Sequence, residues 1–305
     1  MLQFNLHHLI SFLFVAKTRS FSRASEQLGI TQPAVTQHIH ALEVQFGVKL
    51  INLSRKRVFL TKAGERLVPY AEDFYNQAMM ANSFLKSYRL NNLSVGISSQ
   101  LLVYMTALID RFKELHPSTR ISVREAPSLV LIKELLDFRH DVCLVGPAFP
   151  YGERLQIYRI PRNEPMFFVA SPEYPIVTTE NPMAWKHLAP HPLILQSEGS
   201  GARELVLYHF RKRGLTPIIG TEVDNIEFAK ELARQKKGIS FMFEPNIREE
   251  VTRGDLRIIE MEDGPIRVGA IDVLLNKEVV SPAAQAFLKV LTEHFGGIRE
   301  LPPQR

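Results

Sequence analysis

Apolar residues near the start of the chain recur at helical spacing in two short segments separated by a tight turn. Ala24 and Leu28 lie four residues apart on one face, and Gly29 suits the left-handed conformation that ends a helix. Thr31 is a favourable N-cap for the next helix, and Pro33 is tolerated in its first turn. The apolar face of that helix is formed by Val35, Ile39, Leu42 and Phe46. This pattern predicts two helices joined by a turn.

The opposite face of the second predicted helix is polar. It carries Gln32, Thr36, Gln37, His38 and His40. A Gln amide can bond bidentately to adenine, and a Thr methyl can meet the thymine methyl in the major groove of DNA. The face therefore suits base recognition, while an ordinary helical hairpin with a solvated polar face fits the same pattern.

Two short β-prone runs come next and resemble the wing of a winged helix. They span residues 48–53 and 58–64, after a helix stop at Gly47. The basic tip between them consists of Arg55, Lys56 and Arg57. These side chains would reach phosphates or a minor groove, and Thr61 would cap a helix beginning at Lys62 while its backbone faces the DNA strand. A solvated basic loop is the alternative.

The charge of the chain is concentrated in this first part. Residues 1–89 hold 11 Lys and Arg against 5 Asp and Glu, a balance of +6, so of the total of +5 the other residues carry −1. Because the excess is confined to one end, it indicates a polyanionic partner for that end.

A long amphipathic helix is predicted from Lys62 to about Arg89, where the only Gly and Pro residues are Gly64 and Pro69. Its apolar stripe consists of Leu67, Phe74, Ala78, Ala81 and Leu85. A helix of ~27 residues spans ~40 Å, and an apolar stripe of that length is most simply covered by a second copy of the chain. Burial against the helix's own chain is the alternative.

Beyond residue 92 short apolar runs alternate with helical patterns. Strands are predicted at residues 93–97, 121–125, 142–145, 166–170, 193–196, 220–223, 239–243 and 266–275. Helices are predicted at residues 101–115, 129–138, 202–213, 226–235 and 282–295. This alternation predicts an α/β sheet.

Polar residues follow several of these strands, where ligands bind in open α/β sheets. One loop holds Ser98, Ser99 and Gln100, a second holds Gly199, Ser200, Gly201 and Ala202, and Ser128 and Asn225 precede two further helices. Glycines let backbone N–H groups approach an oxyanion, so facing loops of this kind could clamp an anion. Alternatively, the glycine loop is an ordinary tight turn, Ser128 and Asn225 are helix caps, and Arg203 pairs with an acid inside the protein.

Composition excludes several classes of protein. With 305 residues and 45% apolar content, the chain can form two or three compact units. Its single cysteine, Cys143, lies in a strand-like run, which predicts a buried apolar side chain. A chain with one cysteine can form no internal disulfide, which fits a reducing compartment. The longest apolar run has about nine residues, against ~20 for a bilayer span, and the first residues do not resemble a secretory signal. We therefore expect a cytoplasmic protein with no membrane contact.

The sequence also offers no catalytic or metal-binding motif. Its 10 histidines lack paired cysteines or a His-Glu-x-x-His arrangement. A Gly-x-Ser-x-Gly elbow, a phosphate loop and a dinucleotide-binding glycine motif are missing as well. We expect no metal, no cofactor and no enzymatic activity.

The N-terminal pattern is similar, nearly position by position, to that of LysR-type transcriptional regulators. The matching positions are Ala24, Leu28, Thr31, Gln32, Pro33, Ala34, Thr36, Ile39, Leu42 and Glu43, followed by residues 47–50 and 60–64. Gln37 and Asn52 depart from it, because many members have Arg at the first position and an Arg just before the wing. Residues 199–203, Gly-Ser-Gly-Ala-Arg, resemble the Gly-Ser-Gly-Thr-Arg of a subgroup associated with sulfur assimilation and carbon fixation, with Ala202 in place of the Thr.

The resemblance covers the whole chain and implies three parts. They are a winged helix-turn-helix domain at residues 1–61, a linker and dimerisation helix at residues 62–89, and a two-lobed α/β effector domain at residues 90–305, similar to type 2 periplasmic binding proteins. Lobe I would comprise residues 90–163 and 267–305, and lobe II residues 164–266, with crossing strands near residues 160–166 and 264–269.

The function implied is that of a regulator that binds an interrupted inverted repeat in double-stranded promoter DNA as a dimer or tetramer. A small, anionic effector would bind between the lobes, and RNA polymerase is a further partner that the resemblance allows. The expected DNA-binding residues are Ser22, Arg23, Thr31, Gln32, Pro33, Ala34, Thr36, Gln37, His38, His40, Arg55, Lys56, Arg57 and Thr61. The expected effector-binding residues are Ser98, Ser99, Gln100, Ser128, Gly199, Ser200, Gly201, Ala202 and Asn225. Two other hypotheses are a small-molecule receptor of the transport type with a basic appendage, and an enzyme that uses the cleft.

Overall fold

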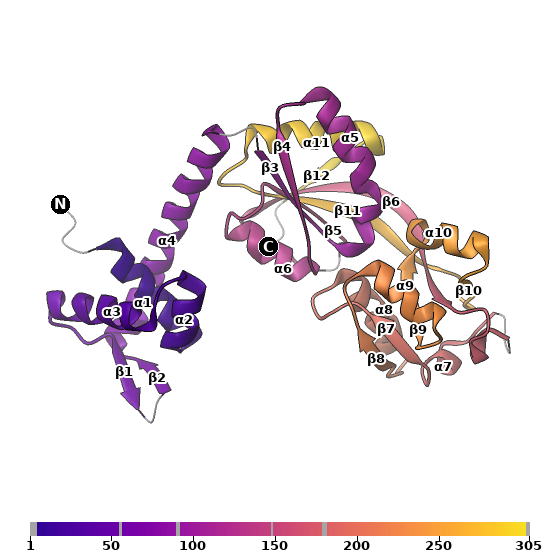
Figure 1. Cartoon of the computed structure of the whole chain (residues 1–305), viewed down its shortest axis with the longest axis horizontal. Helices are drawn as coiled ribbons and strands as arrows, with labels where there is room; N and C mark the ends of the chain where they lie inside the picture. The colour runs from indigo at the N-terminus through magenta and orange to yellow at the C-terminus, as the bar shows by residue number, and fades with distance from the viewer. Residues whose placement is uncertain (1–4, 55–56, 90–91, 148, 179–181, 303–305) are drawn as a thin grey trace. The chain divides into compact units, whose positions relative to one another are not determined.

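The computed structural model describes residues 5–54, 57–89, 92–147, 149–178 and 182–302. The chain divides into two compact units, Met1–Asn82 and Ser83–Arg305, and each is described by itself (Figure 1). Among the described residues, no helix combines the length and apolar content needed to cross a membrane.

The N-terminal unit contains three helices and a two-stranded hairpin. Its elements are α1 (Leu6–Thr18), α2 (Phe21–Leu28), α3 (Gln32–Phe46), β1 (Ile51–Ser54), β2 (Arg57–Leu60) and the first part of α4 (Lys62–Arg89). The predicted boundaries of α2 and α3 are confirmed: Gly29 has φ 66°, and the Thr31 hydroxyl accepts a hydrogen bond from the Ala34 amide at 3.4 Å. Phe12, Leu13, Val15, Ala24 and Val35 are fully buried and form the centre of the core.

The start of α4 belongs to this core. Ala71 is buried there, and Leu67, Phe74 and Tyr75 pack against it. The apolar stripe that predicted a pairing helix therefore splits in two, because its first half is covered by its own unit. The later stripe residues Ala78, Ala81 and Leu85 are exposed.

The C-terminal unit is built on one mixed sheet. Its strands are β3 (Asn92–Ile97), β4 (Arg120–Glu125), β5 (Val142–Val145), β6 (Leu155–Ala170), β7 (Pro192–Leu195), β8 (Ile218–Glu222), β9 (Ile239–Phe243), β10 (Arg257–Ile259), β11 (Ile266–Asn276) and β12 (Arg299–Leu301). The main order is β4-β3-β5-β11-β6-β9-β7-β8, and β10 and β12 pair with β6. Parallel strands form a triplet at each end of this order, β4-β3-β5 and β9-β7-β8, and the antiparallel pair β11 and β6 joins the two triplets. The predicted α/β sheet is confirmed.

Helices cover both faces of each triplet and define two lobes. They are α5 (Met105–Leu115), α6 (Ser128–Leu136) and α11 (Pro282–Phe295) around β3–β5, and α7 (Trp185–Leu188), α8 (Gly201–Lys212), α9 (Ile226–Arg234) and α10 (Glu244–Arg253) around β7–β9 (Figure 1). Short 3-10 helices, η1 (Ser99–Tyr104) and η2 (Pro175–Thr178), complete the unit. We call the two groups lobe I and lobe II. In lobe I, for example, Phe112 and Phe287 pack on one face of the sheet and Leu131 on the other.

Several elements differ from the prediction. The helix predicted from residue 101 begins as η1 and becomes α-helical only at Met105. β6 extends back to Leu155 through Pro161 and Pro165, whose presence breaks the strand pattern in the sequence. The sequence analysis does not predict α10, because its apolar pattern consists only of Ile247 and Val251. In the structure Ile247 is buried, and Glu250 forms a buried ion pair with Lys230 of α9.

Candidate functional site

The polar face of α3 is open to solvent, as a base-reading surface requires. Thr31, Gln32, Pro33, Thr36, Gln37 and His40 are exposed, as are Ser22 and Arg23 of α2, and Ala34 is half-buried. The Ser22 hydroxyl donates to Gln32 Oε1 at 3.3 Å, which links the two helices on this face. Except for Ala34, these residues are therefore accessible to a binding partner.

His38 is placed differently from the prediction. Its Nδ1 lies 2.8 Å from the Ser11 hydroxyl, and its ring stacks on His8 with centroids 4.8 Å apart. Both partners belong to α1. The half-buried imidazole of His38 thus joins α3 to α1, and it does not extend from the exposed face beside Gln37.

The hairpin follows α3 in the chain. Its two strands are antiparallel, and their pairing runs from Ile51 with Leu60 to Ser54 with Arg57. Arg57 is exposed, and the predicted residues Arg55 and Lys56 lie outside the described residues. Thr61 caps α4, since its hydroxyl accepts from the Gly64 amide at 3.1 Å. Its own amide donates to Leu50 O at 3.0 Å, so this amide is not offered to a DNA strand as predicted.

Glu43 supports the hairpin in a way that the sequence did not reveal. Its carboxylate accepts hydrogen bonds from the amides of Leu50 and Ile51, at 2.8 and 3.1 Å, and from Lys49 Nζ at 2.6 Å. Burial alone would raise the pKa of Glu43, but these three donors outweigh it and lower the pKa below its usual value. The sequence did contain a signal for this role, because Glu43 places a carboxylate next to Leu42 on the buried side of α3.

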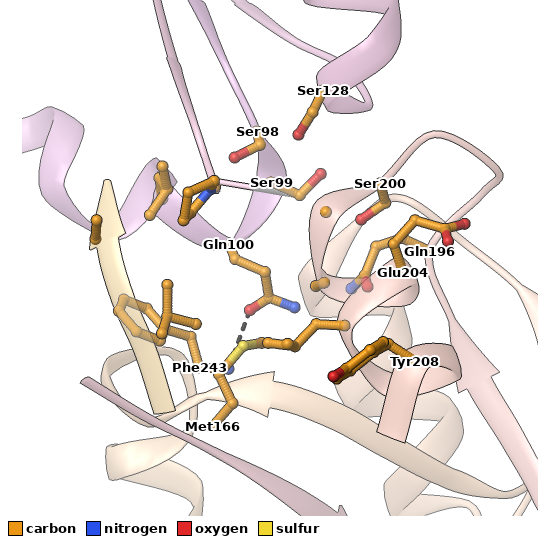
Figure 2. Close-up of a pocket in the computed structure, with 18 of the residues that line it drawn as sticks. Ser98, Ser99, Gln100, Ser128, Met166, Gln196, Ser200, Glu204, Tyr208 and Phe243 are labelled. Atoms are coloured by element: carbon orange, nitrogen blue, oxygen red, sulfur yellow. Dashed lines mark hydrogen bonds between the residues drawn. The ribbon is translucent and has the colours of Figure 1, made fainter. Parts of the chain in front are cut away.

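A cavity of about 440 Å³ lies between the lobes of the C-terminal unit. Its lining includes Ser98, Ser99, Gln100 and Ser128 from lobe I, and Gln196, Ser200, Gly201 and Ala202 from lobe II. Figure 2 shows the hydroxyls of Ser99, Ser128 and Ser200 directed into the same part of this cavity. Most of the predicted effector residues are therefore brought together, although more than 100 residues of chain separate the first from the last.

Two buried polar atoms of the lining lack a hydrogen-bond partner among the described residues. They are Ser128 Oγ and Gln196 Oε1, on side chains that are 0% and 2% exposed. Ser98 and Ser200 occupy N-cap positions of η1 and α8, yet neither hydroxyl caps its helix. Since buried polar groups normally find a partner, this set of hydroxyl and amide groups is arranged for a ligand.

Three predicted effector residues are engaged elsewhere. Gln100 lines the cavity, but its amide bonds to the backbone of β9: Oε1 accepts from Phe243 N at 3.1 Å (Figure 2), and Nε2 donates to Phe241 O at 3.4 Å. Asn225 lies outside the cavity lining and caps α9 through the Phe228 amide at 2.8 Å. Gly199 also lies outside this lining.

Gly199 and Gln100 instead connect the two lobes. The carbonyl of Gly199 in lobe II accepts from the Leu129 amide of lobe I at 3.1 Å. Gly199 has φ 85°, and an added Cβ would lie 3.1 Å from Leu129 Cβ, so this approach requires glycine. The two contacts hold opposite walls of the cavity together.

The charged residues near the cavity are largely paired. Buried Arg203 donates to Glu222 at 2.7 Å and to Gln196 O at 2.9 Å. Arg203 therefore pairs with an acidic residue inside the protein, which is the alternative that the sequence left open. At the rim, Arg211 lies 3.5 Å from Glu204, and the exposed Arg267 donates to Asn163 O at 3.0 Å.

The sequence did not reveal the apolar part of the lining. It includes Leu101, Met166, Leu205, Tyr208, Phe243 and Val268. In the sequence these residues follow ordinary helix or strand periodicity, so nothing distinguishes them from core. Among the described residues, no His, Cys, Asp and Glu are grouped as a metal site requires.

Two regions of the chain match known families. Residues 6–65 match the bacterial regulatory helix-turn-helix protein, lysR family, and residues 90–296 match the LysR substrate binding domain. The chain is 25% identical over 292 residues to the transcriptional activator CmpR of Synechocystis, with 95% of each protein covered. It is 28% identical over 296 residues to the RuBisCO operon transcriptional regulator of Allochromatium vinosum, with 95% of this chain and 96% of that protein covered.

Solved structures share the fold. The regulatory domain of Synechocystis CcmR in complex with 2-PG superposes with a TM-score of 0.58 at 20% identity, over 67% of this chain and 97% of that domain. The named relatives are transcriptional regulators and not enzymes, and the predicted likeness to carbon-fixation regulators is confirmed. The chain therefore belongs to the LysR family: it is a transcriptional regulator with a helix-turn-helix DNA-binding domain and an effector-binding domain.

Proposed function

We propose that this regulator binds an interrupted inverted repeat as a dimer or tetramer and responds to a small anion bound between lobes I and II. The observation that carries the effector half of this proposal is the pair of buried, unpartnered atoms Ser128 Oγ and Gln196 Oε1 in an inter-lobe cavity. The related regulatory domain of Synechocystis CcmR in complex with 2-PG adds support. A contact with RNA polymerase stays a prediction.

The exposed stripe on α4 supports pairing of two chains. Ala78, Ala81 and Leu85 follow three- and four-residue steps, and Leu85 is 64% exposed. A helix of 28 residues with an uncovered apolar stripe of this kind is suited to an antiparallel or parallel partner helix. Two recognition helices related by a dyad read an inverted repeat.

A small anion suits the polar end of the cavity. Hydroxyl groups of Ser99, Ser128 and Ser200 point into it (Figure 2), and the first turns of α6 and α8 supply Ser128, Gly201 and Ala202. The positive ends of two helix dipoles then face one bound group. An effector that contacts both lobes can shift the equilibrium between two arrangements of the lobes only if it binds one arrangement more tightly than the other.

Replacing Gln37 with alanine is expected to weaken sequence-specific DNA binding about 10- to 100-fold and leave non-specific binding unchanged, since a bidentate base contact contributes about 1–3 kcal/mol.

Replacing Arg57 is expected to weaken binding to all DNA sequences. It should also reduce the slope of the logarithm of the affinity against the logarithm of the salt concentration by about one, because one phosphate contact is lost. Gel shifts and footprints on the region upstream of the protein's own gene measure both effects.

Gln77→Ala, an exposed glutamine of α4, is the control for the Gln37 variant. Equal weakening of specific and non-specific binding by Gln37→Ala would show that this residue does not read bases. If the wild type binds DNA without sequence preference at every salt concentration, the proposed recognition of an inverted repeat is contradicted.

Replacing Ser128 with alanine is expected to reduce anion binding by about tenfold, because the hydroxyl contributes a hydrogen bond to a charged group of about 1.5 kcal/mol. Thermal unfolding of the full chain with 2-PG, inorganic phosphate, sulfate and carboxylates measures the effect as a lost increase in Tm. Ser122→Ala, on exposed β4, is the control. An anion that stabilises both variants equally would place its site outside the cavity.

A further inference from the structure

We propose that His8 and His38 form a pH-sensitive contact between α1 and α3, through which DNA binding by this regulator weakens as the two imidazoles become protonated. This inference goes beyond the proposed response to an effector, because it requires no ligand and concerns the DNA-binding unit alone. It is carried by two stacked imidazole rings that lie between the helices without a counter-ion among the described residues.

The two rings meet at the boundary between α1 and α3. Their centroids are 4.8 Å apart, their planes are inclined by 30°, and both side chains are half-buried. His38 Nδ1 lies 2.8 Å from the hydroxyl of Ser11, which is 2% exposed. His8 Nδ1 is buried and has no hydrogen-bond partner among the described residues. A neutral imidazole can leave one nitrogen bare, whereas a protonated ring would place an N–H group here without an acceptor.

The surroundings of His8 disfavour a positive charge. His8 is the third residue of α1, where the partial positive charge at the N-terminus of the helix opposes protonation. Burial, followed by the charges of His38 and His7, lowers the pKa of His8. The geometry and the charges therefore favour the same neutral state.

The other charged groups of the unit do not offset this effect. The remaining acidic and basic side chains in its described part are Lys17, Arg19, Arg23, Glu26, His40, Glu43, Lys49, Arg57, Lys62, Glu65, Arg66, Glu72 and Asp73. None of these residues contributes to the shift in the pKa of His8. The Glu43 carboxylate is held by Lys49 and two hairpin amides, and Glu72 is paired with Lys17. Within the described part of the unit, the stacked rings therefore face each other without a carboxylate that would stabilise their charged forms.

Protonation of both rings places two like charges at stacking distance, and these charges repel each other. The repulsion is relieved only if α3 moves away from α1. Because the exposed side chains of Gln32, Thr36 and Gln37 are carried by α3, such a movement displaces the polar face that meets DNA. The apparent affinity for DNA then falls with the fraction of protein in which the pair is neutral.

NMR titration of the full-length protein with isotopically labelled histidine tests the coupling between the rings. We expect the pKa of His8 to lie below the usual value of about 6.5 and to rise toward it in His38→Gln. The control is His40→Gln, because His40 is exposed on α3 and does not contribute to the shift of His8. An unchanged pKa of His8 in His38→Gln would overturn the inference.

DNA affinity measured at constant ionic strength tests the consequence for binding. The DNA is the region upstream of the protein's own gene, with a scrambled duplex for comparison. Between about pH 7.5 and about pH 5.5 the wild type should lose about three- to tenfold in specific affinity, since this interval spans the protonation of histidine. His8→Gln and His38→Gln should match the wild type at the higher pH and lose less than about twofold.

Two further variants separate this effect from other causes. His8→Gln keeps the hydrogen bond between Ser11 and His38, so it tests the pair even if His38→Gln destabilises the unit. His40→Gln should lose at least as much affinity as the wild type, because it removes a charge that attracts phosphates at low pH.

A wild type whose specific affinity does not fall, or an equal fall in the wild type, His8→Gln and His38→Gln, would overturn the inference. If the wild type shows no sequence preference at the higher pH, the proposed recognition of an inverted repeat is contradicted instead. The titration of His8 with and without His38 then decides the present inference by itself.

Discussion

Replacing Glu43 with alanine is expected to destabilise the N-terminal unit by about 3 kcal/mol and to weaken DNA binding strongly. The substitution leaves the amides of Leu50 and Ile51, residues that are 6% and 8% exposed, without their acceptor. A buried donor that loses its partner costs about 1–3 kcal/mol. Leu50 directly precedes β1 and Ile51 begins it, so the hairpin that follows α3 loses its anchor.

Chemical denaturation of the wild type and the variant measures this loss. Glu72→Ala provides the control, because Glu72 and Lys17 form an exposed ion pair of 3.0 Å that should contribute less than about 1 kcal/mol. If the Glu43 variant loses no more than the Glu72 variant, the carboxylate is not the anchor of the hairpin.

The same carboxylate makes the stability of this unit sensitive to acid. The pKa of Glu43 is lowered in the folded protein, because the hydrogen bonds from Lys49 and the two amides outweigh the effect of burial. Its contribution is therefore complete above the unfolded pKa of about 4.3 and is lost as the pH falls through the lower folded pKa. Unfolding measured between pH 7 and pH 2 should show this loss in the wild type and not in Glu43→Gln.

Replacing Asp272 with alanine is expected to destabilise the C-terminal unit by about 3 kcal/mol. Asp272 is fully buried on β11 and accepts two hydrogen bonds from Arg159 of β6, both at 2.7 Å. The Tyr151 hydroxyl lies 2.8 Å from the same carboxylate, and burial followed by the Asp272 charge raises the pKa of Tyr151. Removing one partner of a buried ion pair leaves the other uncompensated.

This network also reaches the cavity. The Tyr151 hydroxyl lies 3.1 Å from Gly146 O, and Gly146 belongs to the lining. We therefore expect Asp272→Ala to weaken ligand binding in addition to lowering Tm. Glu278→Ala, which breaks the more exposed 3.1 Å pair with Arg154, is the control. A change of less than about 1 kcal/mol in the Asp272 variant would show that the pair does not stabilise the crossing strands.

Local patterns in the sequence determined α2, α3 and the hairpin of the DNA-binding unit, whereas α1 was not predicted. Gly29, Thr31 and Pro33 predicted where α2 ends and α3 begins, because capping and proline geometry depend on a few neighbouring residues. His38 shows the limit of such patterns. Spacing alone placed it beside the exposed face of α3, and only packing against Ser11 and His8 decided that its ring turns toward α1.

In the C-terminal unit, the sequence by itself determined the α/β alternation and the polar loops at strand ends, since periodicity and loop chemistry are local. Tertiary structure decided which polar residues share a cavity: Ser128 faces it without a partner, whereas Asn225, chosen by the same reasoning, caps α9. It also decided that Gln100 ties the lobes together and that Met166, Tyr208 and Phe243 form an apolar wall. The physical reason is that hydrogen-bond satisfaction and shared burial depend on residues far apart in the chain, which only the folded arrangement brings into contact.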